Sequence, residues 1–191
     1  MLTPTEVQRL FESCGALLNG HFLLTSGLHS QQYLEKFHVL QHPDLTSQLC
    51  AEIAQRFKDD NIQVVVGPAT GGIILAHEVG RQLGMRAIFT EREGGLMTLR
   101  RGFQIAQGER ALVVEDIVTT GGSLQEVLDI VNGLGGELVG VALLCDRSNG
   151  KLNLGVRTEA LMTLNAAAYA PDECPQCKNG EPITERGSRH L

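Results

Sequence analysis

From residue 63 onward, short apolar runs alternate with stretches in which apolar side chains recur every three or four positions. The short runs are typical of strands covered on both faces, and they span 64–66, 87–89, 111–114 and 138–144. The stretches between them have helical spacing, over about 73–83 and 123–134. This alternation predicts an α/β fold with a twisted, mostly parallel sheet flanked by helices, whose ligands bind at the carboxyl ends of the strands.

The first third of the chain has a different pattern. Thr3, Pro4 and Glu6 have the arrangement of a capping box with proline at the first helical position, which predicts a helix near the start. Residues 20–30 are expected to form strand and loop. Apolar residues at helical spacing predict a second helix over about 44–58.

Two acidic residues and a Thr- and Gly-rich turn follow the apolar run 111–114. The acidic pair is Glu115 and Asp116, and the turn comprises Ile117, Val118, Thr119, Thr120, Gly121, Gly122 and Ser123. Such a turn can direct N–H and O–H groups at an anion where a helix begins. The carboxylates would repel a bare phosphate, but they could accept hydrogen bonds from sugar hydroxyls or face a bridging metal ion. The motif therefore predicts a site for a phosphorylated sugar.

Other interpretations of this stretch explain less of it. A Walker loop needs a lysine directly before Ser/Thr, and Gly122 stands at that position. The dinucleotide fingerprint G-x-G-x-x-G is also missing from the turn. A plain turn after a solvated strand end is the structural alternative, but it leaves the combination of strand, acidic pair and turn unexplained.

Composition narrows the class of protein. The 191 residues carry a formal net charge of −6, which disfavours general binding to nucleic acid or to an anionic membrane. No apolar segment approaches the ~20 residues needed to span a bilayer. The N-terminus lacks the layout of a signal peptide, and the five cysteines are scattered. We therefore expect a cytoplasmic protein and, because no Pro/Gly-rich linker divides it, a single domain over 1–191.

The acidic pair and the following turn resemble the signature of the type I phosphoribosyltransferases, which bind 5-phosphoribosyl diphosphate (PRPP). The resemblance implies that Glu115 and Asp116 hold the ribose hydroxyls and that residues 117–123 bind the 5-phosphate. It also implies Mg²⁺ as cofactor, held mainly by PRPP without direct protein ligands.

A second glycine-rich turn, over 66–72, is similar to the diphosphate-binding loop of this family. By position, the diphosphate contacts would come from Ala69, Thr70 and Gly71. The family fold adds a small N-terminal hood to the sheet. That implies a hood over about 1–40 together with the C-terminal tail, and a core over about 44–165.

Two further segments resemble the branch of the family whose acceptor base is orotate. Residues 21–30, which include Ser26 and Gly27, are similar to the hood of that branch. Residues 145–148 are similar to a strand end where an arginine, here Arg147, meets the orotate carboxylate. A planar guanidinium suits a carboxylate because it can donate two parallel hydrogen bonds. A surface ion pair with Asp146 is the alternative role for Arg147.

The resemblance implies transfer of the phosphoribosyl group from PRPP to N1 of orotate. The products would be orotidine 5′-monophosphate and diphosphate, in pyrimidine nucleotide synthesis. Thr119 resembles a loop threonine that the family also uses near the base. A purine base as acceptor is the nearest alternative. A regulator that binds PRPP without turnover is the alternative from another class, but the chain has no basic face or added domain to support it.

Residues 91–101 fit neither the strand nor the helix period well. Gly94-Gly95 gives a flexible point between basic residues, so the segment is either an exposed hairpin with solvated charge or a mobile lid. The family carries such a flap here, which implies diphosphate contacts and a catalytic role for Arg92 and Arg100. The family also implies a homodimer whose flap reaches across the interface. Thr25 stands where many members have lysine, and the flap is short, so which arginine contacts the diphosphate stays open.

The C-terminal pair Cys174 and Cys177 has the C-x-x-C spacing of zinc sites. A structural zinc site needs four ligands, usually from two such pairs, and His190 is only a weak candidate for a third. A zinc ion shared between the two subunits of a dimer is the alternative. A thioredoxin-like redox role is less favoured because the pair lies in a tail and not at a strand-to-helix turn.

Overall fold

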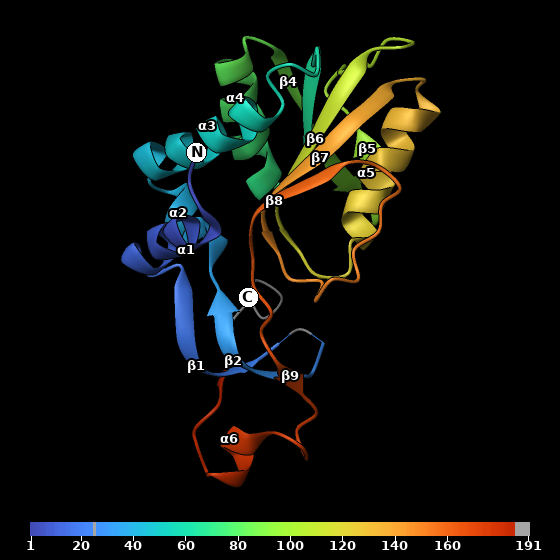
Figure 1. Ribbon diagram of the computed structural model, residues 1–191. Helices are drawn as coiled ribbons and strands as arrows, with labels where there is room; N and C mark the ends of the chain where they lie inside the picture. The colour runs from blue at the N-terminus through green and yellow to red at the C-terminus, as the bar shows by residue number, and fades with distance from the viewer. Residues whose placement is uncertain (25, 186–191) are drawn as a thin grey trace.

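The chain folds around two β-sheets of unequal size (Figure 1). The computed structural model describes residues 1–24 and 26–185. The larger sheet has the strand order β5-β4-β3-β6-β7-β8. Its strands are β3 (Val64–Pro68), β4 (Arg86–Glu93), β5 (Leu96–Leu99), β6 (Arg110–Val118), β7 (Glu137–Asp146) and β8 (Thr158–Thr163). All neighbouring pairs from β4 to β8 are parallel, and β5 pairs antiparallel with β4. The mostly parallel sheet predicted from the apolar pattern is confirmed.

Helices pack on both faces of this sheet. Because successive side chains of a strand point to opposite faces, Leu112 and Val114 of β6 join one apolar core while Ala111 and Val113 join the other. The first core includes side chains of the helices α1, α3 and α4, and the second includes those of α5. The helices are α1 (Pro4–Ser13), α2 (Lys36–Leu40), α3 (Pro43–Arg56), α4 (Gly71–Leu83), α5 (Gly122–Gly133) and α6 (Pro175–Lys178).

Local sequence signals explain where several helices begin. The Thr3 side chain accepts a hydrogen bond from the Glu6 N–H at 3.3 Å, and the Glu6 carboxylate accepts one from the Thr3 N–H at 2.8 Å, which confirms the capping box of α1. The helices α4 and α5 begin at glycines that closely follow the carboxyl ends of β3 and β6. Both glycine-rich turns therefore open at the same edge of the sheet.

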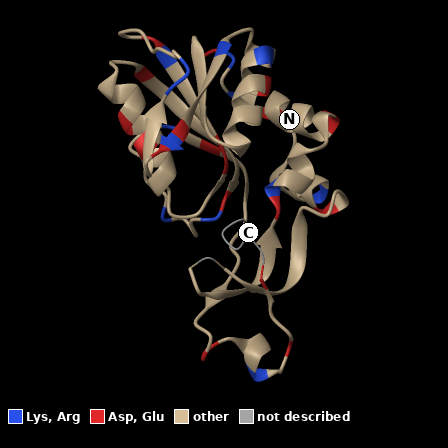
Figure 2. Cartoon of the chain, turned by 180° about the vertical axis from the view of Figure 1, so that it is seen from behind, with Lys and Arg blue, Asp and Glu red and all other residues tan. Residues whose placement is uncertain are grey.

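The smaller sheet brings the two ends of the chain together. Its strand order is β10-β1-β2-β9, and its strands are β1 (Leu17–Leu23), β2 (His29–Leu34), β9 (Ala168–Tyr169) and β10 (Thr184–Glu185). The C-terminal segment thus supplies both strands that flank the β1–β2 hairpin, with α6 between them. Figure 2 shows acidic and basic residues spread over the larger sheet and its helices, whereas β1 and β2 contain no Asp, Glu, Lys or Arg.

None of the helices in the described ranges has both the length and the apolar character needed to cross a bilayer. Residues 91–101, which fitted neither sequence period, form a β-hairpin from the end of β4 and from β5. Gly94 and Gly95 both have positive φ, at 58° and 89°, as a tight hairpin turn requires.

Candidate active site

The acidic pair lies at the end of β6, which continues through it to Val118. Asp116 is buried and Glu115 is half-buried. The N–H of Asp116 donates to the Glu115 carboxylate at 2.9 Å, and the N–H of Ile117 donates to Asp116 Oδ1 at 2.7 Å. These local hydrogen bonds fix both carboxylates at the strand end.

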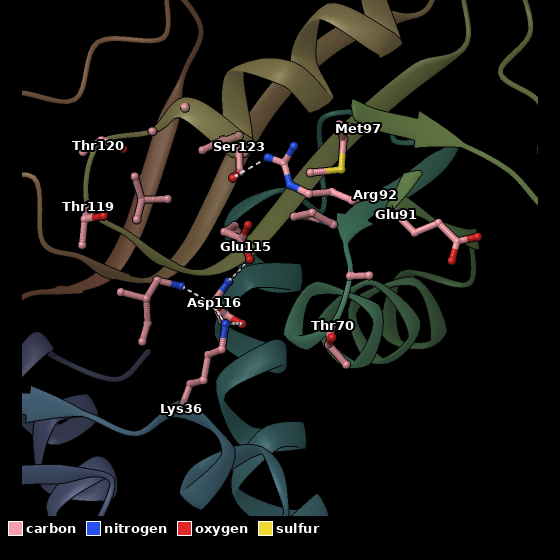
Figure 3. Close-up of a pocket in the computed structure, with 17 residues that line it drawn as sticks. Lys36, Thr70, Glu91, Arg92, Met97, Glu115, Asp116, Thr119, Thr120 and Ser123 are labelled. Carbon is pink, nitrogen blue, oxygen red and sulfur yellow. Dashed lines mark hydrogen bonds and ion pairs between the residues drawn. The ribbon is translucent and has the colours of Figure 1, made fainter. Parts of the chain in front are cut away.

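A lysine from the first third of the chain neutralises Asp116. Lys36 begins α2, and its ammonium lies 3.0 Å from Asp116 Oδ1 and 2.8 Å from Oδ2 (Figure 3). Sequence reasoning missed Lys36, because an isolated lysine 80 residues from the motif carries no local signal. Lys36 therefore belongs to the site, because its positive charge compensates a buried carboxylate.

The turn after β3 packs directly against Asp116. A Cβ atom added to Gly71 would collide with Asp116 Oδ2, so only glycine lets the first turn of α4 approach the carboxylate this closely. The peptide bond between Ala69 and Thr70 is cis, and both residues are exposed. The N–H of Ala69 donates to Thr90 O of β4 at 2.7 Å. The two predicted loops therefore meet at one place.

The turn after β6 leads into α5 through a left-handed residue. Gly121 has a φ of 81° and forms the N-cap of α5, and a Cβ atom there would clash with the Leu152 side chain. Thr119 and Thr120 are exposed beside it. Free N–H groups of a helix start, together with these hydroxyls, form the kind of site that binds phosphate.

The hairpin formed by β4 and β5 reaches this turn through Arg92. The Arg92 guanidinium donates to Ser123 Oγ at 3.2 Å (Figure 3). It also pairs with Glu126 of α5 at 3.0 Å. Arg100 instead pairs with Glu93 at 3.1 Å, within the hairpin. The structure therefore brings Arg92, but not Arg100, to the turn that follows β6. Residues 91–101 thus form the hairpin that was one of the two sequence interpretations. A role as a mobile lid stays a prediction.

These elements enclose a pocket of about 550 Å³, within the ~300–1,000 Å³ typical of small-molecule sites. Carboxylates, hydroxyls and backbone groups line it together with two cations, Lys36 and Arg92. Its lining contains the predicted residues Ala69, Thr70, Glu115, Asp116, Ile117, Val118, Thr119, Thr120, Gly121, Gly122 and Ser123. Among the described residues, Gly71, Arg100, Arg147, Ser26 and Gly27 lie outside this lining.

Arg147 lies beside the pocket and not in its lining. Its backbone N–H donates to Val118 O at 2.8 Å, so the segment after β7 runs alongside the start of the turn. Its Nε is buried without a hydrogen-bond partner among the described residues, and burial lowers the pKa of the guanidinium. Asp146 accepts from the Ser148 N–H at 2.7 Å, and the described part of the chain shows no ion pair between Asp146 and Arg147. A buried donor without a partner suits an anionic ligand.

Ser26 and Gly27 lie in the exposed loop that joins β1 to β2, where the Gly27 N–H donates to Leu24 O at 2.9 Å. Thr25, at the position where many family members have lysine, lies outside the described residues. The structure therefore places the hood loop on a hairpin but does not bring it to the pocket lining.

Electrostatics separate the two carboxylates. Burial and the negative charge of Asp116 raise the pKa of Glu115 from its ordinary 4.5 to about 8. The positive charge of Lys36 acts in the opposite sense. The raised pKa favours the protonated form of Glu115 at neutral pH.

The pocket fits a metal ion that arrives with its ligand. Mg²⁺ prefers oxygen ligands, and the lining offers carboxylate, hydroxyl and carbonyl oxygens. However, Lys36 already contacts both oxygens of Asp116. A direct Asp116–Mg²⁺ bond would have to displace this ammonium, so Glu115 is the carboxyl group that would face a metal ion arriving with its ligand.

Comparison with known proteins identifies the family. A family model for the phosphoribosyl transferase domain matches residues 39–155. The chain is 55% identical over 186 residues to the orotate phosphoribosyltransferase of Desulforamulus reducens, with 97% of each chain covered.

Solved structures share the fold. The chain is similar to orotate phosphoribosyltransferase from Aeropyrum pernix, with a TM-score of 0.70 and 25% identity, covering 83% of this chain and 93% of the other. It also resembles adenine phosphoribosyltransferase from Rhodothermus marinus, with a TM-score of 0.67 and 22% identity, covering 82% and 99%. The fold alone is therefore shared by enzymes named for different bases, and the strong sequence identity is what distinguishes between them.

Proposed function

The chain belongs to the orotate phosphoribosyltransferases of the phosphoribosyltransferase family, and we propose that it transfers the phosphoribosyl group of PRPP to N1 of orotate. The bond between the ribose anomeric carbon and the diphosphate breaks, and the diphosphate leaves with the electron pair. A bond from N1 of orotate to the same carbon replaces it. The products are orotidine 5′-monophosphate and diphosphate, in pyrimidine nucleotide synthesis. The observation that carries this proposal is the pocket in which the acidic pair of β6 faces the start of α5.

The ends of PRPP are assigned to different elements. The 5-phosphate is placed at the turn 119–123, where N–H and O–H groups meet the start of α5. The ribose hydroxyls are placed at Glu115 and Asp116, which can accept their hydrogen bonds. The diphosphate is placed at Ala69, Thr70 and Gly71. This orientation puts the anomeric carbon between the two loops that Gly71 holds together.

The reaction builds positive charge on the ribose as the leaving group departs. The Asp116 carboxylate at the ribose favours that charge, and cations at the diphosphate stabilise the leaving group. Bound Mg²⁺ supplies charge neutralisation on the diphosphate. Arg92 is the hairpin residue assigned to the same group, because it lines the pocket together with Ala69 and Thr70. Closure of the hairpin over the pocket would exclude water, which could otherwise intercept the ribose cation.

Arg147 is assigned to the orotate carboxylate. Its buried, unpartnered Nε and its position beside Val118 support this role, since a planar carboxylate would satisfy the donor and the charge together. Ser26 and Gly27 of the β1–β2 loop are assigned to the same acceptor, as the hood of this branch implies. A purine base has no ring carboxylate to satisfy Arg147.

The family resemblance also supports a homodimer, with the hairpin of one subunit contributing to the neighbouring site. All five cysteines are free, which suits the reducing cytoplasm.

The test is a turnover assay with PRPP, Mg²⁺ and orotate, followed by the loss of orotate absorbance, with hypoxanthine and uracil as parallel acceptors. Turnover with orotate alone supports the reaction and the acceptor together. Turnover with hypoxanthine would show that the acceptor is a purine base and not orotate. PRPP binding without turnover of any base would make the chain a PRPP sensor that shares the fold.

A further inference from the structure

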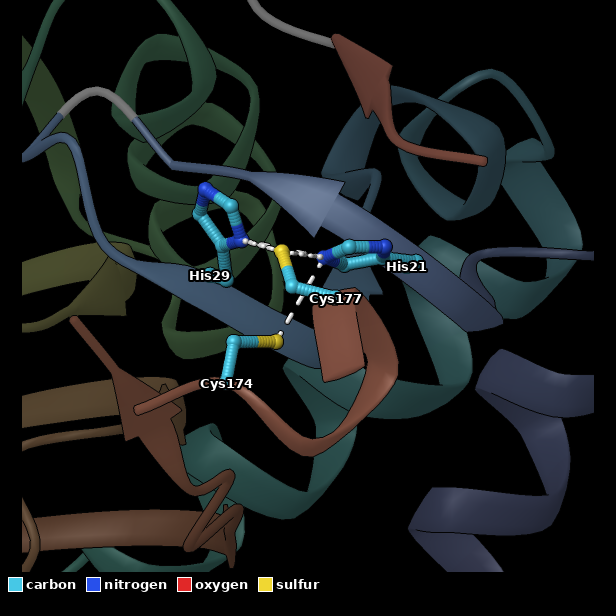
Figure 4. A group of neighbouring side chains, drawn as sticks. All are labelled: His21, His29, Cys174 and Cys177. Carbon is cyan, nitrogen blue, oxygen red and sulfur yellow. Dashed lines mark hydrogen bonds between the residues drawn. The ribbon is translucent and has the colours of Figure 1, made fainter. Parts of the chain in front are cut away.

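Four metal-binding side chains meet at the hood, far from the pocket. They are His21 on β1, His29 on β2, and Cys174 and Cys177 around α6 (Figure 4). Their ligand atoms all lie within 4.8 Å of one another. Among the described residues, this is the only such group of three or more. His21, His29 and Cys174 are buried, and Cys177 is the least buried of the four.

The spacing of these atoms matches a tetrahedral metal site. His21 Nε2 lies 3.0 Å from His29 Nδ1 and 3.5 Å from Cys174 Sγ. Cys177 Sγ lies 3.7 Å from the same His21 atom and 3.2 Å from His29 Nδ1. Tetrahedral zinc with its usual bond lengths separates two nitrogens by about 3.3 Å, nitrogen from sulfur by about 3.6 Å, and two sulfurs by about 3.8 Å. The four atoms are therefore already near the corners of a zinc-sized tetrahedron.

The surroundings select the correct form of one ligand. His21 Nδ1 lies 3.0 Å from the carbonyl oxygen of Glu181. A carbonyl can only accept, so Nδ1 carries the proton and Nε2, which faces the two sulfurs, has a free lone pair. Metal-bound histidines usually have such a partner on the second ring nitrogen.

The ligand set indicates which metal and which role. Two thiolates and two imidazoles in a tetrahedron are typical of zinc, and four protein ligands leave no open position for substrate. Such closed sites are structural. The ligands come from opposite ends of the chain, since 153 residues separate His21 from Cys174. A metal here would tie the C-terminal segment to the β1–β2 hairpin.

We propose that His21, His29, Cys174 and Cys177 bind one structural zinc ion, which fixes the C-terminal segment to the hood. The smaller sheet needs such a tie, because β9 and β10 are each two residues long and β1 and β2 carry no charged residues for ion pairs. The described protein contacts across this junction include the buried Gln176, which donates to Gly20 O at 3.2 Å.

The first test is the zinc content of the full chain after loading with zinc under reducing conditions and removal of excess metal, measured by mass spectrometry of the metal. We expect one zinc per chain in the wild type and a loss of most of it in Cys177→Ser and His21→Asn. Cys14→Ser and His77→Asn are matched controls, because neither residue belongs to the cluster, and both should retain the metal. Substoichiometric zinc in the wild type, or equal loss in the controls, would overturn the proposal.

A second measurement on the wild type avoids variants that fail to fold. Replacement of zinc by Co²⁺ should give the visible bands of a tetrahedral site and a thiolate-to-metal charge-transfer band. Chelation should abolish both and speed proteolysis within residues 170–185. Cobalt spectra without the thiolate band would assign any bound metal to another place. As a further check, free thiols are alkylated in the cell before the protein is isolated. A Cys174–Cys177 disulfide found in that protein would overturn the zinc proposal and show that the two cysteines are a redox pair.

Discussion

The ammonium of Lys36 lies within 3.0 Å of both carboxylate oxygens of Asp116 and connects α2 to the end of β6. The Asp116 side chain is 2% exposed and that of Lys36 is 33% exposed. Removing the cation would leave a buried carboxylate without its counterion, which costs several kcal/mol in fully buried pairs. The partial exposure of Lys36 reduces this cost.

We therefore expect Lys36→Met to lower the free energy of unfolding at pH 7 by about 1–3 kcal/mol. Urea denaturation measures the loss. Lys58→Met, at an exposed position after α3, is the control and should stay close to the wild type. A Lys36→Met variant as stable as the wild type would show that the ion pair contributes nothing to the stability of the fold.

Gly71→Ala should damage the site through steric contact, because the added methyl group meets Asp116 Oδ2. A displacement of about 1 Å at a reacting centre can cost about a hundredfold in rate, so we expect a fall in kcat of roughly ten- to a hundredfold. Steady-state kinetics with PRPP and orotate measure the effect. Gly133→Ala, where the methyl group meets no atom within 4 Å, should keep full activity. Equal activity of the two variants would show that the turn after β3 does not position the reacting atoms.

Glu115 gives the protein a specific pH dependence. Its pKa is raised from 4.5 to about 8 in the folded protein, so the folded state holds a proton that the unfolded state releases between these values. Stability contributed by this carboxyl is therefore complete below about pH 4.5 and falls as the pH rises toward 8. Glu115→Gln removes the titration, and it should be more stable than the wild type at pH 8, with the difference vanishing near pH 4.5 and growing above it by up to about 1.4 kcal/mol per pH unit.

Thermal unfolding of both proteins across this pH range measures the difference, with Glu173→Gln on an exposed turn as control. A stability difference that grows toward acidic pH would show that the fold lowers the pKa of Glu115 and does not raise it.

Arg147→Ala should weaken the binding of orotate far more than the binding of PRPP. A charged hydrogen bond contributes about 1.5–3 kcal/mol, which corresponds to a rise of roughly ten- to a hundredfold in the Michaelis constant for orotate. Arg147→Lys keeps the charge but loses the two parallel donors, so it should recover only part of the affinity. Equal effects of Arg147→Ala on both Michaelis constants would remove this residue from the acceptor site.

The sequence predicts the parts of this molecule that depend on local pattern. The buried strands and the helix starts follow from apolar runs, capping residues and glycines, and they lie within a few residues of the predicted bounds. The predicted turn 117–123 is shorter than expected, because Ile117 and Val118 still belong to β6. Contacts between distant segments leave no such signal. Lys36 meets Asp116 only because α2 folds back against the end of β6. Cys174 and Cys177 suggest zinc by their spacing, but the expected third ligand, His190, lies outside the described residues, and the structure instead brings His21 and His29 to them.

The two arginines of the hairpin carry the same charge but differ in their position relative to the pocket. Arg92 lines the pocket and reaches Ser123, whereas Arg100 pairs with Glu93 on the hairpin. If the hairpin stabilises the departing diphosphate through Arg92, Arg92→Ala should lower kcat by roughly ten- to a hundredfold, and Arg100→Ala should change it by less than about threefold. Both variants remove one positive charge, so the comparison cancels general electrostatic attraction of PRPP. Single-turnover kinetics at saturating substrates measure the chemical step. A larger effect of Arg100→Ala would show that the hairpin rearranges on substrate binding and exchanges one arginine for the other.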